Sequence, residues 1–168
     1  PETLDFTDYD SVKDHLTVQV INAKANQRML SQVPHKQMED LSVICRIEFP
    51  SPAGEGVGSV KVTHEMLSQW GVHPKEVYQK AVENAVKSSP AVLMSMDDLM
   101  MEMMGLPFET KNLLQLKEGE EFPKDGMYVL SNPMRVNGAS VLAYPNLQEQ
   151  LESVFPQAVI SSLRLSMR

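Results

Sequence analysis

Apolar residues recur along the chain first with a helical period and then with the period of a strand. Between residues 8 and 32 they follow the spacing of a single helical stripe, which ends where Pro34 disfavours helical geometry at Val33. The stripe consists of Val12, Leu16, Val20, Ala23 and Leu30. In LSVICRIE (41–48) the period changes to two, with Ile44 as the exception. We therefore predict a first helix over 8–32 and a half-buried strand from residue 41.

Turn residues arrange the strand-like segments into two predicted hairpins. FPSPAGEGVGS (49–59) supplies the turn of a hairpin over 41–63 with a long loop. MYVL (127–130) and ASVLAY (139–144) flank a turn that contains Asn137-Gly138, a pair typical of hairpins. AVISSL (158–163) then adds a last strand.

Four further helices are marked by residues that usually begin and end helices. Ser, Thr or Asn oxygens cap the first turn, Pro suits the first helical position, and Gly follows the last turn. The predicted helices begin at Thr63, Pro74, Ser95 and Asn146, and their stop signals are Gly71, SSP (88–90), Gly105 and Pro156.

The order of these elements predicts the fold class. Strands come in antiparallel pairs and do not alternate singly with helices. We therefore predict an α+β fold, with an antiparallel or mixed sheet built from two hairpins plus a C-terminal strand and with helices packed on it. We expect residues 1–168 to form a single domain. Because the chain begins at Pro1 without a methionine, we also expect it to be part of a longer chain.

Composition narrows the classes of partner. The net charge is −7, and the 15 basic residues are spread singly, so we expect no nucleic-acid partner. The apolar runs are only a few residues long, so we expect no membrane-spanning segment. The single cysteine, Cys45, fits a reducing cytoplasm.

The stretch VTHEMLSQWGVHPKEVYQK (62–80) begins like a zinc protease. A zinc-binding helix needs two histidines four residues apart, but the residue four after His64 is Ser68. His73 lies beyond a helix-stopping glycine. We therefore interpret the stretch as the starts of two helices and predict no metal. GEGVGS (54–59) leads into a strand, not a helix, so we predict no phosphate-binding cofactor either.

Cys45 is a candidate nucleophile, with His35 or His64 as its base. Its place on the apolar side of an alternating strand favours a buried, inert thiol. His73 is a further candidate, and any catalytic site would have to be assembled in three dimensions from these residues.

Methionine is the most unusual feature, because six of the twelve methionines lie between Met94 and Met104. Part of this segment forms one helical stripe, but Met101 and Met104 widen its apolar arc. Deep burial, a partner-binding surface and contact with another part of the parent chain all fit this excess. The candidate binding residues are Met100, Met101, Met104 and, at the tip of the second predicted hairpin, Arg135.

Four blocks of the chain resemble a bacterial family that is known only as a domain of unknown function. They are VPHKQMEDLSVICRI, VTHEMLSQWGVHPKEVYQKAVENA, SMDDLM and MYVLSNPMRVNGASVLAYP. The likeness extends in order from about Asp5 to near Leu163. Members of the family that the chain resembles occur mainly in gut-associated Gram-positive bacteria. The resemblance implies no catalytic residue, cofactor or substrate.

The sequence alone identifies no activity, and it supports two hypotheses. The first is a non-catalytic, cytoplasmic interaction or scaffold domain that binds another protein or the rest of its parent chain. The second is a small hydrolase or transferase whose site is assembled around His35, Cys45 and His64.

Overall fold

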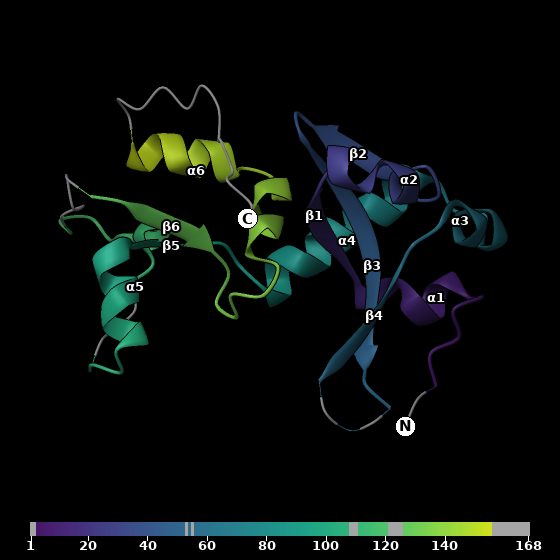
Figure 1. The fold of residues 1–168 in the computed structure, drawn as a ribbon, viewed down its shortest axis with the longest axis horizontal. Helices are drawn as coiled ribbons and strands as arrows, with labels where there is room; N and C mark the ends of the chain where they lie inside the picture. Colours follow the sequence, from purple (N-terminus) through teal and green to yellow (C-terminus); the bar gives the residue numbers. More distant parts are fainter. Residues whose placement is uncertain (1–2, 53, 55, 108–110, 121–125, 156–168) are drawn as a thin grey trace. The chain divides into compact units, whose positions relative to one another are not determined.

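The computed structural model describes residues 3–52, 54, 56–107, 111–120 and 126–155. The chain divides into two compact units, Pro1–Ser88 and Ser89–Arg168, and each is described by itself. Both units combine helices with antiparallel strands, which confirms the predicted α+β class (Figure 1). A single domain over 1–168 stays a prediction.

The first unit is organised around its longest strand, β3 (Leu41–Pro50), which pairs antiparallel with three others. Its pairing with β4 (Val57–Lys61) confirms the first predicted hairpin. The remaining elements of this unit are α1 (Tyr9–Val12), a 3-10 turn (Lys13–His15), β1 (Leu16–Asn22), a second 3-10 turn (Lys24–Asn26), α2 (Gln27–Leu30), β2 (His35–Met38), β4 (Val57–Lys61), α3 (His64–Trp70) and α4 (Pro74–Ser88).

One face of this sheet forms the core of the first unit together with α4. The register places Leu16 opposite Ile47, Val18 opposite Cys45 and Val20 opposite Val43, so these side chains share a face. α4 packs against this face through one apolar side, and its buried residues are Val77, Ala81, Val82 and Ala85. Burial of these apolar side chains is the main stabilising contribution in the unit.

The opposite face of the sheet is covered as well. Ile44 is buried in a cluster with Ala23, Leu30 and Val33, which explains why it interrupts the alternation of its strand. Next to this cluster, the Arg46 guanidinium donates hydrogen bonds to the side-chain oxygens of Gln19 and Ser59. Residues 42–45 of β3 are therefore buried on both faces, whereas the alternation of buried Ile47 with exposed Glu48 is that of the predicted half-buried strand.

The predicted first helix over 8–32 is wrong. Asp8 caps a helix as expected, but α1 ends at Val12 and β1 follows from Leu16. Leu16 and Val20 are four residues apart, and that spacing fits the period of a strand as well as that of a helix. The β-branched residues around Val18 and the pairing with β3 favour the strand.

Both ends of α3 were predicted correctly, whereas Asn146 precedes α6 without a capping hydrogen bond from its side chain. The Thr63 hydroxyl accepts from the Met66 backbone N–H, and Gly71 ends α3 at a left-handed φ of 65°. α4 begins at Pro74, which makes the stretch 62–80 two helix starts, as predicted. In the part of the chain that the structure describes, no helix has the length and apolar character needed to cross a bilayer.

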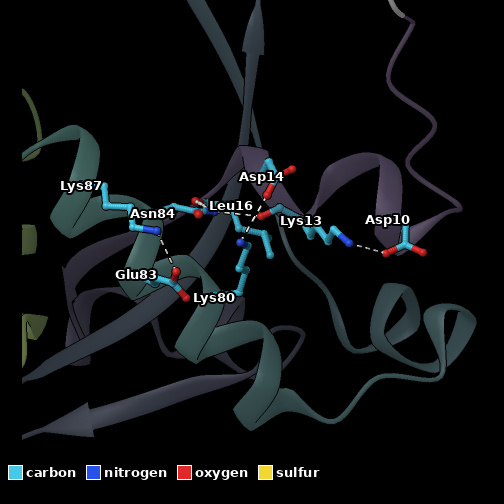
Figure 2. A network of polar contacts seen from close by, with 8 residues as sticks. All are labelled: Asp10, Lys13, Asp14, Leu16, Lys80, Glu83, Asn84 and Lys87. Atoms are coloured by element: carbon cyan, nitrogen blue, oxygen red, sulfur yellow. Dashed lines mark hydrogen bonds and ion pairs between the residues drawn. The ribbon is translucent and has the colours of Figure 1, made fainter.

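The Asn84 side chain connects α4 by hydrogen bonds to the segment that leads into β1 (Figure 2). Its side-chain amide donates to the backbone carbonyl oxygens of Lys13 and Leu16, at 2.8 and 3.0 Å. Lys80 on the same helix pairs with Asp14, at 3.3 Å. The partly buried amide satisfies two carbonyl groups where α1 and β1 meet.

Replacement of Asn84 by Ala is expected to lower the free energy of unfolding by about 2 kcal/mol, because two hydrogen bonds are lost and of the two carbonyl groups only that of Lys13 keeps another donor among the described residues, the Leu16 N–H. A urea titration followed by fluorescence of Trp70, the only tryptophan, reports on this unit. Glu83→Ala on the same helix is the control, because it removes only the exposed pair with Lys87 and should leave the urea midpoint nearly unchanged. Equal midpoints for the two variants would contradict the role assigned to Asn84.

The second unit contains a two-stranded antiparallel sheet of β5 (Val92–Ser95) and β6 (Tyr128–Ser131). Its apolar cluster is built on Leu93, Leu113, Leu147 and Leu151. The Asn112 side chain supports β5 by accepting from the Leu93 N–H and donating to the Ala91 carbonyl. The other elements are α5 (Met96–Met103), a 3-10 turn (Leu113–Gln115), a 3-10 helix (Gly138–Ala143) and α6 (Leu147–Val154).

The second predicted hairpin is wrong in its pairing. Residues 128–131 form a strand as expected, but its partner is β5, and 138–143 is a 3-10 helix. The buried residues there are Ser140, Val141 and Tyr144, whose spacing is helical and does not alternate. Asn137 does adopt the left-handed conformation expected of a turn residue. The predicted C-terminal strand at 158–163 lies outside the described residues.

Candidate functional site

The methionine-rich segment forms α5, which begins and ends where the sequence predicts. The Ser95 hydroxyl accepts from the Asp98 backbone N–H at 3.1 Å, and Gly105 follows the helix with a φ of 68°. α5 contains no fully buried residue. This distinguishes it from α4 and α6, which bury apolar side chains along one side.

Most methionines of the methionine-rich segment that forms α5 are exposed to solvent. Met96 and Leu99 are half-buried, but the exposed fractions are 54% for Met100, 77% for Met103 and 64% for Met104. Met101 is exposed at 37%. Of the three explanations for the excess of methionine, deep burial is therefore wrong for these four residues.

Arg135 belongs to the same region, because its guanidinium pairs with the Glu102 carboxylate on α5. The same group lies 3.9 Å from the Met94 sulfur. Arg135 lies in the loop after β6, where its backbone has a left-handed φ of 54°. Arg135 therefore connects this loop to α5 and is not an isolated cation at a turn.

Further apolar side chains are exposed beside these contacts. Met134 and Val136 flank Arg135, and the Met127 carbonyl accepts from the Met96 N–H at 2.8 Å at the start of α5. We call the combined set the methionine surface: Met100, Met101, Met103, Met104, Leu106, Met127, Met134 and Val136. Exposed apolar groups gathered on neighbouring segments usually mark an interaction surface.

The structure places the histidine candidates in separate settings. His64 is the exposed first residue of α3, and its N–H donates to the Gln32 carbonyl. The Nδ1 atom of His73 accepts from the Lys75 N–H, which is a capping role at the start of α4. Within the described ranges, no three His, Cys, Asp or Glu side chains are grouped so that they could hold a metal ion.

Cys45 and His35 border one pocket but do not form a dyad. Cys45 lies opposite Val18 on the face of the sheet that packs on α4, whereas His35 lies opposite Ile44, which belongs to the other face. The His35 Nδ1 atom is 3.0 Å from the Val33 carbonyl oxygen. Burial raises the pKa of the Cys45 thiol from 9.0 to about 12, so the thiol is neutral at physiological pH.

The pocket beside Cys45 has a volume of about 460 Å³ and lies between β2, β3 and α4. Its lining residues are Pro34, His35, Lys36, Val43, Cys45, Pro74, Lys75, Val77, Tyr78 and Gln79. Burial raises the pKa of the Tyr78 hydroxyl, and the neighbouring Cys45 adds to that increase. The pocket offers an apolar binding volume without an activated nucleophile.

The profile of a family described as a family of unknown function, DUF5688, matches residues 1–160. The chain belongs to DUF5688. Membership confirms the resemblance that the sequence blocks indicated, while a bacterial origin stays a prediction. No curated protein and no solved structure matches the chain.

In this DUF5688 chain, the sequence alone indicated part of the methionine surface but not the pocket. It identified Met100, Met101, Met104 and Arg135 but missed Met127 and the residues that flank Arg135. Only the pairing of β5 with β6 brings these segments to α5. The pocket was missed because its lining comes from three separate segments. The position of Lys36 opposite Val43, at the edge of the pocket, follows from the β2–β3 register and could not be predicted from the sequence.

Proposed function

We propose that this chain is a non-catalytic interaction domain that captures a basic, amphipathic helical segment of another protein on its methionine surface. The observation that carries the proposal is the exposure of Met100, Met103 and Met104 on a helix with no buried residue. A soluble chain rarely exposes this much apolar side chain on one short helix without a partner to cover it.

Methionine suits such a surface because its thioether side chain is flexible and polarisable. It can adjust to the apolar face of a partner helix without a fixed complementary shape. Helix-in-groove recognition uses apolar anchors at helical spacing, and flexible methionines accommodate several anchor patterns.

The charges around the surface favour a basic partner. α5 carries Asp97, Asp98 and Glu102 and no lysine or arginine. Arg135 neutralises one of these carboxylates, which leaves two acidic groups at the first turn of the helix. The whole chain has a net charge of −7, so long-range attraction also favours a cationic segment over nucleic acid. The proposal includes a cytoplasmic setting, which the single cysteine supports.

The test uses a peptide of about 20 residues that places Leu on one helical face and Lys on the other. We expect it to bind and to shift the ε-methyl NMR signals of Met100, Met103 and Met104. The triple replacement of these residues by Ser should weaken binding at least about tenfold, because it removes the apolar contacts. It should change the free energy of unfolding by less than about 0.5 kcal/mol per site, because the side chains are exposed.

Two controls make the result specific. Val57→Ser removes an equally exposed apolar side chain from β4 and should leave peptide binding unchanged. A peptide with Glu in place of Lys should bind more weakly, because it meets acidic groups on α5. The proposal fails if the triple variant binds as the parent does. It also fails if the triple variant unfolds, since the methionines would then be structural.

The second hypothesis, a small hydrolase or transferase around His35, Cys45 and His64, has less support. Its nucleophile is a neutral thiol, and the register directs His35 to the other face of the sheet. His64 is the exposed first residue of α3, whereas Cys45 is buried.

A further inference from the structure

The pocket between β2, β3 and α4 belongs to the first unit and plays no part in the proposed capture of a protein. Its floor is apolar, because Val43, Cys45 and Val77 face into the sheet–helix interface. Pro34, Pro74 and Tyr78 extend the apolar lining outward. A volume of about 460 Å³ is in the range of small-molecule sites.

The polar groups of this pocket lie at its mouth, and they are cationic. Lys36 and Lys75 border it, and the Lys36 ammonium lies 5.5 Å from the centre of the Tyr78 ring. Neither ammonium group pairs with a carboxylate among the described residues. The chain as a whole has a net charge of −7, whereas the mouth of this pocket carries two positive charges without acidic partners among the described residues.

An apolar pocket with two cationic groups at its mouth suits a ligand that has an apolar body and one anionic end. We propose that the pocket binds a medium-chain aliphatic carboxylate, whose charged end lies between Lys36 and Lys75. The alkyl chain lies against the accessible side chains of Pro34, Pro74 and Tyr78, above the buried apolar floor. The neutral Cys45 thiol behaves as a small apolar group at the floor. A polar ligand such as a nucleotide would leave most of its hydrogen-bonding groups against apolar side chains, which is unfavourable.

The test is calorimetric titration of the whole chain with decanoate. We expect a dissociation constant on the order of 10–100 µM, from the usual affinity per heavy atom of a ligand of this size. Hexanoate and octanoate should bind progressively more weakly, by about two- to fourfold per methylene removed, because each methylene buries apolar surface. Decanol matches the alkyl chain without the charge and should bind about tenfold more weakly.

Variants at the mouth test the carboxylate contact. The double replacement Lys36→Met and Lys75→Met keeps the apolar stems of both side chains and removes their charge. It should weaken decanoate binding about tenfold and leave decanol binding unchanged. Lys61→Met, at an exposed lysine on β4 outside the pocket, is the matched control and should bind decanoate as the parent does.

Methyl NMR locates the bound ligand. We expect decanoate to shift the methyl signals of Val43 and Val77 and to leave those of Met100 and Met103 in place. Shifts confined to the methionines would mean detergent-like adsorption on the methionine surface and would overturn the proposal. Absence of binding at millimolar decanoate, or equal affinity for decanol and decanoate, would also overturn it. None of these outcomes bears on the capture of the basic peptide, so the two proposals fail independently.

Discussion

Cys45 is expected to react with Ellman's reagent at pH 8 about a thousandfold more slowly in the native protein than in concentrated urea. The reagent attacks the thiolate, and the buried thiol has a pKa of about 12 against an ordinary value of 9.0. At pH 8 the thiolate fraction is then about one in ten thousand when folded and about one in ten when unfolded. The absorbance of the released thiol gives both rates, and Cys45 is the only cysteine in the chain.

The same pKa difference fixes the direction of a pH effect on stability. The folded pKa lies above the unfolded one, so the unfolded chain loses its proton first as the pH rises. The stabilisation from burying the neutral thiol is therefore complete below about pH 9 and is lost as the pH approaches about 12.

An exposed cysteine provides the control for the reaction rate. Lys61→Cys in a Cys45→Ala background places a single thiol on β4, where the side chain is exposed, and it should react at similar rates in native buffer and in urea. If native Cys45 reacts as fast as this control, the thiol is accessible and its pKa is not raised, which contradicts the expected burial. If it reacts faster than the control, the thiol is activated. The hydrolase or transferase hypothesis would then gain the nucleophile that it now lacks.

The parts of the fold that were predicted correctly depend on interactions within a few residues. Gly71 and Pro74 act through their own backbone geometry, and the Thr63 and Ser95 hydroxyls each accept from a backbone N–H only three residues away. Such local preferences can be recognised in a single sequence. The hairpin of β3 and β4 was also predicted because its two strands are joined by a Gly/Pro-rich loop.

The errors occur where a distant segment decides the outcome. Residues 16–22 satisfied both periods, and the pairing with β3, whose partner residues lie 19 to 31 positions further along the chain, made them a strand. Residues 128–131 took β5 as their partner, although 139–144 is closer in sequence. Contacts of this kind leave little trace in local periodicity, because any strand of suitable length can supply the missing hydrogen bonds.

The candidate sites show the same division. Composition alone drew attention to Met100, Met101 and Met104, but a methionine stripe fits burial and exposure equally well. The exposure of these side chains on α5, which decides between them, is a tertiary property. For Cys45 the alternating pattern was sufficient, because an apolar position on a paired strand is usually buried.

Ile47→Ala is expected to lower the free energy of unfolding by about 3–4 kcal/mol, as measured by urea titration with Trp70 fluorescence. Ile47 is completely buried on β3, where it lies opposite Leu16 on one side and Val60 on the other. Removal of three carbon atoms loses apolar burial and leaves a cavity that a paired central strand cannot easily close.

Val57→Ala is the matched control, because Val57 lies on β4 but is 70% exposed. It should change the free energy of unfolding by less than about 0.5 kcal/mol. A small effect of Ile47→Ala would mean that the sheet–α4 interface is loosely packed, and it would also undermine the pocket that the same interface forms. A large effect would support a rigid floor at Val43 and Cys45, which the alkyl chain of a carboxylate ligand requires if each methylene is to contribute to its binding.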